Sequence, residues 1–284
     1  MKRFEAPAKL NLSLHVMPPG AHGYHPLDSM VQTVEWVDYL NSEPGEGSDT
    51  IEVVGADLSS EDNLVLRAAR KARDEVDFPP LRFILEKNLP VAAGLGGGSS
   101  DAAAALLAVE DAVGRSIQLD SIAELVGADV SLFLSGGTIR MTGFGEQIER
   151  LRALDGFAVA VVVPDFGLST TDVYAKWDEM EGPTGTPVSD DLLPPPLRGA
   201  MPMRNDLLPA ALELDPRLGD FMADVRSAWG TAVCLTGSGS ACFGYFGTVE
   251  EADDAASAVS DISSVGRGVA LRARGARQLQ KSAQ

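Results

Sequence analysis

The sequence predicts an α+β protein in two lobes, residues 1–150 and 151–284, joined near residue 150. The chain has 284 residues, of which 45% are hydrophobic and 23% charged, as in a globular protein of one large domain or two smaller ones. Strand and helix patterns mix without a strict β-α-β alternation, which favours α+β over α/β. A buried-strand pattern begins again after residue 150, at 157–163.

The first lobe opens with residues 4–16, which alternate between apolar and polar side chains. Leu10 and Leu12 fall on one face, Lys9 and Asn11 on the other, and this period of two predicts a half-buried strand. Residues 101–113 are rich in Ala and Leu and predict a strong helix. Further helices are expected at 63–76 and 120–126, a short apolar segment at 130–134, and strands at 30–40, 51–54, 81–86 and 138–141.

The second lobe mixes short strands with amphipathic helices. Residues 181–200 hold five of the chain's 17 prolines and predict a long loop. Strands are expected at 157–163, 231–235, 241–246 and 269–272. Helices are expected at 171–180, 206–214, 217–229 and 250–262.

Composition excludes several classes of protein. The net charge of −18 repels nucleic acid and anionic membranes, so we expect neither as a partner. Only two cysteines are present, and no His or Cys pairs have the spacing of zinc ligands. No apolar run approaches the roughly 18 residues of a membrane span, and the N-terminus lacks a signal-peptide core. We therefore expect a cytoplasmic monomer or homodimer that binds small molecules.

The most informative stretch lies between a predicted strand and the Ala-rich helix. Four of the five residues 94–98 are glycine, which lets backbone N–H groups turn toward a ligand. The helix that follows adds unpaired N–H groups and the positive end of its dipole, a combination that suits phosphate oxygens. The alternative is a flexible turn with an ordinary helix cap. The candidate residues are Pro90, Val91, Ala92, Ala93, Gly94, Leu95, Gly96, Gly97, Gly98, Ser99 and Ser100.

This stretch matches neither the P-loop, since no Gly-Lys-Ser/Thr occurs, nor the dinucleotide fingerprint, because the third glycine is missing. It resembles the ATP loop of the GHMP kinases, the family of galactokinase, homoserine kinase and mevalonate kinase. Two more stretches resemble family motifs in order, Ala-Pro-Ala-Lys-Leu-Asn-Leu at 6–12 and Leu-Thr-Gly-Ser-Gly-Ser-Ala at 235–241. The resemblance implies the two-lobed GHMP kinase fold, with an N-terminal lobe like ribosomal protein S5 domain 2 and a ferredoxin-like C-terminal lobe. It also implies ATP and Mg²⁺ as cofactors, with Ser99 or Ser100 within reach of the metal and no metal ion held by the protein alone.

Further stretches most resemble family members whose acceptor is a cytidyl diphosphate sugar alcohol. These are Gly23-Tyr24-His25, Gly127-Ala128-Asp129-Val130 and Asn205-Asp206-Leu207. The resemblance implies that Lys9 and Asp129 are catalytic, with Asp129 taking the proton of the acceptor hydroxyl. It implies substrate contacts by Asn11, Tyr24, His25, Tyr174, Thr236, Gly237 and Ser238.

Each of these assignments has a plainer alternative. Lys9 and Asn11 can simply lie on the solvent-exposed face of a strand, and Asp129 can be a helix N-cap. Residues 236–240 can be a tight turn, and Tyr174 fits a core stripe of its predicted helix. For the whole chain, the alternatives are a homoserine or mevalonate type of kinase, or a non-catalytic sensor with the same fold.

Overall fold

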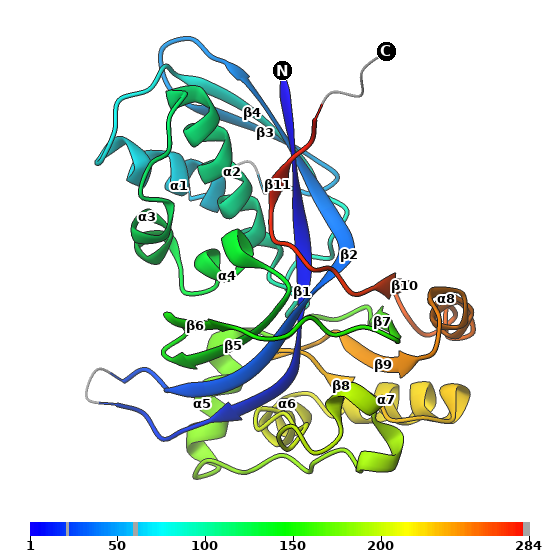
Figure 1. Cartoon of the computed structure of the whole chain (residues 1–284). Coiled ribbons are helices and arrows are strands. Elements are labelled where there is room, and N and C mark those ends of the chain that lie inside the picture. The colour runs from blue at the N-terminus through cyan, green and yellow to red at the C-terminus, as the bar shows by residue number, and fades with distance from the viewer. Residues whose placement is uncertain (21–22, 59–61, 281–284) are drawn as a thin grey trace.

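The first strand forms the axis of the molecule. The computed structural model describes residues 1–20, 23–58 and 62–280, and in it β1 (Lys2–Val16) runs antiparallel to β2 (Leu27–Pro44) through both lobes (Figure 1). The prediction that one side of this strand faces solvent is wrong. Lys9 and Asn11 on that side are buried, as is Leu10 on the opposite side. The glycine-rich loop and the 235–241 motif cover that side, through hydrogen bonds to the N–H groups of Lys9 and Asn11.

Within the described residues the larger sheet has seven strands. Its order is β11-β1-β2-β4-β3, and β5 and β6 extend it from the other half of β2. β2 thus pairs with β5 near its start and with β4 near its end. The remaining strands are β3 (Thr50–Val54), β4 (Leu81–Glu86), β5 (Thr138–Gly143), β6 (Gln147–Arg150) and β11 (Arg277–Gln278).

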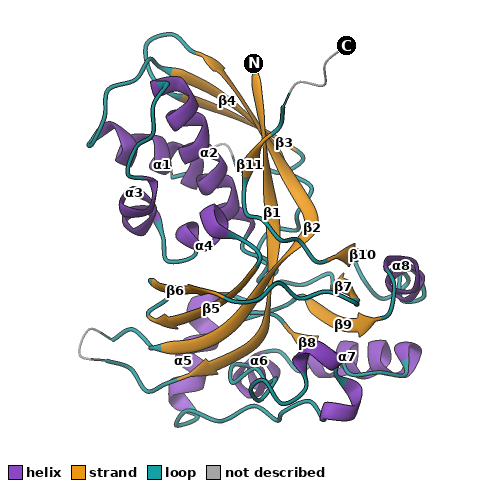
Figure 2. Ribbon diagram, viewed as in Figure 1, coloured by secondary structure: helices purple, strands orange, loops and turns teal. Residues whose placement is uncertain are grey.

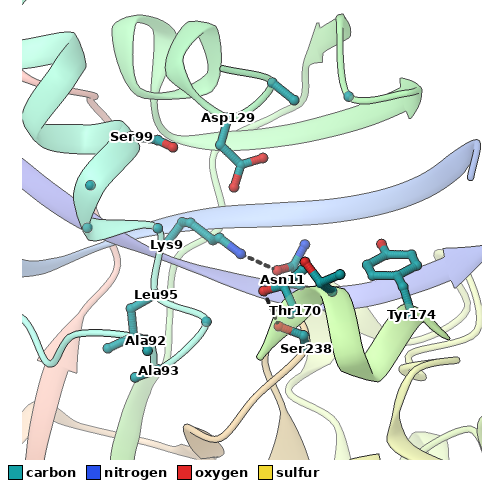
Figure 3. A pocket seen from close by; sticks show the side chains of 18 of the residues that line it. Lys9, Asn11, Ala92, Ala93, Leu95, Ser99, Asp129, Thr170, Tyr174 and Ser238 are labelled. Atoms are coloured by element: carbon teal, nitrogen blue, oxygen red, sulfur yellow. Dashed lines mark hydrogen bonds between the residues drawn. The ribbon is translucent and has the colours of Figure 1, made fainter. Parts of the chain in front are cut away.

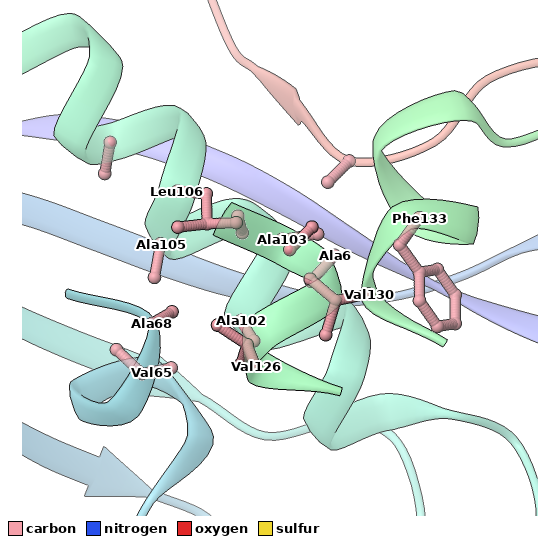
Figure 4. Packing of buried hydrophobic residues seen from close by; sticks show 14 of the residues in the cluster. Ala6, Val65, Ala68, Ala102, Ala103, Ala105, Leu106, Val126, Val130 and Phe133 are labelled. Carbon is pink, nitrogen blue, oxygen red and sulfur yellow. The ribbon is translucent and has the colours of Figure 1, made fainter. Parts of the chain in front are cut away.

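A layer of helices covers one face of this sheet (Figure 2). They are α1 (Leu64–Arg73), α2 (Gly97–Val113), α3 (Leu119–Val126) and α4 (Val130–Ser135). The centre of the layer is α2, whose Ala102–Ala105 run is fully buried against Val65 and Ala68 of α1, Val126 of α3 and Val130 of α4 (Figure 4). Small alanine side chains let the neighbouring helices approach closely, which fixes the start of α2 relative to β1.

The smaller sheet has the order β10-β7-β9-β8. β7 is buried on both faces, since alternate residues join one core with the helices and another with β1 and the glycine-rich loop. This second core, with Leu10, Leu12 and Leu89, joins the two sheets. The elements are β7 (Ala158–Val163), α5 (Thr170–Glu179), α6 (Leu208–Leu214), α7 (Arg217–Trp229), β8 (Cys234–Leu235), β9 (Cys242–Phe246), α8 (Val249–Ser257) and β10 (Val265–Ala270), with short 3₁₀ turns at Asp190–Leu192 and Pro195–Leu197.

The α+β prediction is confirmed, and the C-terminal details differ from it. The last strand of the smaller sheet is β10 rather than 269–272, and it contains two glycines that hide its strand pattern. Gly268 is required there, because a Cβ would lie 2.2 Å from the backbone nitrogen of Asp253. The short strands β6 and β11 were not predicted, and β11 carries the chain back to β1 of the larger sheet. No helix in the described part of the chain is long and apolar enough to cross a membrane.

Candidate active site

The glycine-rich loop is anchored at both of its ends. The N–H of Lys9 donates to the carbonyl of Leu95 at 3.0 Å, and the N–H of Ala241 donates to the carbonyl of Ala93 at 3.2 Å. Gly96 adopts the left-handed conformation, with φ of 73°, and caps α2. The N–H groups of the first turn of α2 have no partner within the helix, and the helix dipole adds positive potential at this point.

Two glycines of the loop are required by close packing. A Cβ on Gly94 would lie 2.4 Å from the carbonyl oxygen of Thr236, and one on Gly96 would lie 2.7 Å from the ring of Phe133. Both positions also have positive φ, which disfavours any residue with a side chain. The loop therefore has a set shape, unlike the flexible turn that was the alternative.

Almost all the predicted site residues line one cavity of about 1010 Å³. Two do not. Thr236 is fully buried, and its hydroxyl accepts a hydrogen bond from the N–H of Asn11 at 2.9 Å. The hydroxyl of Ser100 is buried behind the loop, so Ser99 is the serine that faces the cavity. The predicted residues on the wall are Lys9, Asn11, Tyr24, His25, Pro90, Val91, Ala92, Ala93, Gly94, Leu95, Gly96, Gly97, Gly98, Ser99, Asp129, Tyr174, Gly237 and Ser238.

Lys9 and Asn11 contact each other on the wall of this cavity, and the Asp129 carboxylate points toward them from another part of the wall (Figure 3). The Lys9 ammonium donates to Asn11 Oδ1 at 2.6 Å, and Asn11 donates in turn to the Ser29 hydroxyl at 2.8 Å. Burial lowers the pKa of Lys9, and the negative charge of Asp129 partly opposes that effect. Asp129 stands at the N-cap position of α4, yet its carboxylate makes no capping hydrogen bond in the described structure. The carboxylate is thus available to a ligand.

The 235–241 motif is held against these residues by its neighbours. Ser238 and Thr170 share a hydrogen bond of 2.8 Å between their hydroxyls, which ties the motif to the start of α5 (Figure 3). The Asn205 amide donates to the carbonyls of Leu235 and Gly237 at 3.0 and 2.8 Å. Asn205 therefore shapes this turn, a role that the sequence did not predict beyond the resemblance.

Aromatic side chains form the far end of the cavity. The rings of His25 and Tyr174 lie 5.2 Å apart, and the ring of Trp177 meets His25 edge-on at the same distance. Tyr24 is 72% exposed at the rim. Tyr174 packs against the smaller sheet's helical core and also lines the cavity, so its place in the core is confirmed and its contact with substrate stays a prediction. Burial, with a smaller contribution from Asp129, raises the pKa of Tyr174 to about 12.

Several wall residues were missed by the sequence analysis. Lys87 lies just before the glycine-rich loop, where its ammonium is buried and pairs with Asp38 and, at 2.8 Å, with Asp101 of α2. Burial alone would lower the pKa of Lys87, but the two carboxylates outweigh it and raise that pKa. Phe144 and Asp178 line the aromatic end. The sequence could have indicated Lys87 as a site residue, because it lies just before the loop. Phe144 and Asp178 reach the cavity only through the packing of the folded chain.

The residues present suit a metal ion carried by phosphates rather than one held by the protein. In the described ranges no group of three or more His, Cys, Asp or Glu side chains could hold a metal ion. Mg²⁺ commonly takes one or two protein oxygens and fills its other positions with phosphate oxygens and water. Ser99 at the start of α2 and the Asp129 carboxylate are two side-chain oxygens of the cavity wall that could serve in this way.

Comparison with known proteins agrees with this geometry. Residues 63–137 match the family model of the GHMP kinases N terminal domain. The chain is 40% identical over 261 residues to 4-diphosphocytidyl-2-C-methyl-D-erythritol kinase of Paracoccus denitrificans, covering 89% of this chain and 90% of that protein. The enzyme of the same name from Rhizobium leguminosarum is 36% identical over 90% of this chain and 89% of its own length.

Solved structures agree as well. A crystal structure of 4-(cytidine 5'-diphospho)-2C-methyl-D-erythritol kinase superposes with a TM-score of 0.77 at 32% identity, over 95% of this chain and 99% of that one. A homoserine kinase from Cytophaga hutchinsonii, 16% identical, superposes with a TM-score of 0.71 over 98% of this chain and 97% of that one, and shares the fold. The two-sheet GHMP kinase fold is thereby confirmed, and the fold and cavity define an ATP-dependent kinase of the GHMP class. Within that class the chain belongs to the 4-diphosphocytidyl-2-C-methyl-D-erythritol kinase family.

Proposed function

We propose that the chain transfers the γ-phosphate of ATP to the 2-hydroxyl of 4-diphosphocytidyl-2-C-methyl-D-erythritol, a step of the non-mevalonate route to isoprenoid precursors. The observation that carries this proposal is that one cavity is lined by the Lys9–Asn11 pair and the Asp129 carboxylate, together with the glycine-rich loop and an aromatic wall. Family membership over about nine-tenths of the chain supports the choice of acceptor. Because this substrate is soluble in water, we expect the enzyme to act in the cytoplasm.

The proposed reaction is a direct displacement at phosphorus. Asp129 takes the proton of the acceptor hydroxyl, the hydroxyl oxygen forms a bond to the γ-phosphorus, and the bond from that phosphorus to the β-γ bridging oxygen breaks to release ADP. The Lys9 ammonium, fixed by Asn11, stabilises the negative charge that develops on the oxygens. Phosphoryl transfer asks mainly for such positioning and charge stabilisation.

The glycine-rich loop would hold the ATP phosphates through its backbone. The net charge of −18 repels a nucleoside triphosphate at long range, so a local site must supply the attraction. First-turn N–H groups of α2, the helix dipole and Lys9 do so here. Mg²⁺ bound with ATP would neutralise phosphate charge, and Ser99, which lines the cavity at the start of α2, would be a residue that reaches it.

The aromatic wall would hold the cytidine of the acceptor. Tyr24 and Tyr174 are proposed to take the cytosine ring between them, with His25 at its edge. Stacking a base on an aromatic ring is worth roughly 1–3 kcal/mol. Gly237 and Ser238, which line the cavity, are proposed to contact the substrate near the reacting hydroxyl.

The test is ADP release over a panel of acceptors, namely the cytidyl substrate, homoserine and mevalonate. We expect steady ADP formation with the cytidyl substrate and little with the other two. Turnover of homoserine or mevalonate instead would move the chain to another branch of the class. Binding of ATP with no ADP formation from any acceptor would support a non-catalytic sensor.

A further inference from the structure

Three charged side chains, Asp38 of β2, Lys87 and Asp101 of α2, form a buried cluster beside the glycine-rich loop. The Lys87 ammonium pairs with Asp38 and, at 2.8 Å, with Asp101, and each of the three side chains is at most 4% exposed. Lys87 and Asp101 belong to the cavity wall, yet the proposed reaction uses none of the three. Burying two carboxylates with one ammonium costs free energy that apolar side chains at the same positions would not.

Asp38 also holds the backbone of the turn that leads into the loop. Its Oδ1 accepts hydrogen bonds from the N–H groups of Asn88 at 2.5 Å and Leu89 at 2.7 Å. Neighbouring residues of β2 add two more bonds, because the Trp36 indole donates to the Asn88 carbonyl and the Asn88 amide donates to the Val37 carbonyl, both at 3.1 Å. The start of the loop is therefore fixed to the larger sheet.

The other end of the loop is tied to the same cluster. Asp101 lies in the second turn of α2, close behind the unpaired N–H groups of the first turn. A Cβ on Gly97 would lie 3.2 Å from Lys87 Nζ and 3.6 Å from Asp38 Oδ2, so this first residue of α2 packs directly on the cluster. Lys87 thus connects the strand side of the loop, through Asp38, with the helix side, through Asp101.

We propose that Asp38 and Asp101 are positioning residues, which act through Lys87 to hold the glycine-rich loop in its ATP-binding shape before ATP arrives. The inference rests on the proposed function, because it concerns the ATP phosphates. A site whose backbone donors are already in place loses less binding free energy to ordering them. ATP affinity therefore depends on the cluster, whereas the phosphoryl transfer step and the affinity for the acceptor do not.

Asp101 allows the effect on ATP to be separated from an effect on stability. Burial raises the pKa of Asp101 to about 7, with Lys87 opposing this rise and the charge of Asp38 adding to it. Its Oδ1 has no hydrogen-bond partner among the described residues. The folded chain therefore binds this proton more tightly than the unfolded chain, so the ionised carboxylate lowers the unfolding free energy at neutral pH. Removing the carboxylate should leave the fold at least as stable.

The experiment measures ATP affinity by calorimetry in the wild type, Asp101→Ala, Asp101→Asn and Asp38→Asn. We expect Asp101→Ala to lose about tenfold in ATP affinity with no fall in melting temperature, as for one hydrogen bond to a charged group. Asp101→Asn keeps an oxygen that can accept from Lys87, so it should retain most of the affinity. Asp38→Asn should lose at least as much as Asp101→Ala, because an amide N–H would face the ammonium. In all three variants kcat and KM for the acceptor should stay near the wild-type values.

The matched control is Glu5→Gln, which removes a carboxylate from another buried cation. Glu5 pairs with Arg272 at 2.6 Å, and the Arg272 side chain is 2% exposed. Neither residue is among the described residues that line the cavity. The control should lower the melting temperature without changing ATP affinity. A loss of ATP affinity in Glu5→Gln equal to that in Asp101→Ala would show a general effect of weakened folding and would overturn the inference.

Amide hydrogen exchange of the protein without nucleotide tests the inference independently of activity. The Leu89 N–H is bonded to Asp38, and the Ser100 N–H is bonded to the Gly96 carbonyl at 3.0 Å, so the two amides report on the two ends of the loop. Exchange should be faster at Ser100 in Asp101→Ala and at Leu89 in Asp38→Asn. Unchanged ATP affinity in both variants would overturn the inference. If the wild type binds no ATP, the proposed function fails instead, and unchanged exchange in both variants would then overturn the inference.

Discussion

The two ends of the cavity are built in different ways. The proposed phosphate end consists of the backbone of the glycine-rich loop, held by hydrogen bonds from β1 and from the 235–241 motif, and it leaves no room for a Cβ at Gly94 or Gly96. The aromatic end consists of side chains from the β1–β2 hairpin, the β5–β6 turn and α5, and Tyr24 is 72% and Phe144 45% exposed. A site built from backbone tolerates few substitutions, and its glycines can be recognised in the sequence. A site built from side chains can be altered one residue at a time.

The largest expected effect lies between the two ends. Asp129→Asn should lower kcat by about 10²–10⁴-fold, because a positioned base contributes about that much. ATP affinity should stay near the wild-type value, since the asparagine keeps the shape and the α2 loop is untouched. Steady-state kinetics and calorimetry measure the two quantities. Near-native turnover in folded Asp129→Asn would show that Asp129 is not the general base.

The aromatic end should respond by affinity for one substrate only. Tyr174→Ala or Tyr24→Ala should raise KM for the cytidyl acceptor by about 5- to 150-fold, the equivalent of roughly 1–3 kcal/mol of stacking. Phenylalanine at either position should be nearly neutral, and KM for ATP should not move. The same kinetic assay checks all three. A raised KM for ATP alone would show that these rings contact ATP rather than the cytidyl acceptor.

The phosphate end can be tested with two glycines of one helix. Gly96 and Gly114 cap α2 at its two ends, both with φ of 73°, but a Cβ would meet other atoms within 4 Å at Gly96 and none at Gly114. Gly96→Ala should weaken ATP binding by about tenfold or more, whereas Gly114→Ala should bear the same left-handed strain, about 1 kcal/mol, without that loss. Calorimetric ATP affinity and melting temperature separate the effects. Equal affinities in the two variants would contradict a phosphate site at this loop.

The smallest effect concerns stability. Burial lowers the pKa of Lys9 in the folded chain, so the unfolded chain binds its proton up to higher pH. The unfolding free energy contributed by Lys9 therefore rises with pH between the folded value and the unfolded value of about 10.4. Lys9→Met should remove this dependence and raise the unfolding free energy at pH 7 by about 1 kcal/mol, while turnover is lost. Denaturant unfolding across pH measures it, and a strong destabilisation at pH 7 would contradict the account.

The sequence was informative wherever a local pattern decides the structure. The alternation in 4–16 predicted β1, and the glycines before an Ala-rich run predicted the phosphate loop. Alternation alone could not tell that both faces of β1 are buried, since the covering segments come from residues 93–95 and 236, far along the chain. Residue type equally could not place Phe144 or Asp178 at the cavity, because each arrives there through the packing of a whole element. The boundary near residue 150 stays a prediction about folding units.

The central claim is that ATP and the cytidyl group occupy opposite ends of one cavity at the same time. Calorimetric titration of cytidine diphosphate into enzyme saturated with a non-hydrolysable ATP analogue tests it most directly. The account predicts one-to-one binding that is retained with the analogue present and weakened about 5- to 150-fold in Tyr174→Ala. Complete displacement of cytidine diphosphate by the analogue in the wild type, or an unchanged affinity for cytidine diphosphate in Tyr174→Ala, would contradict it.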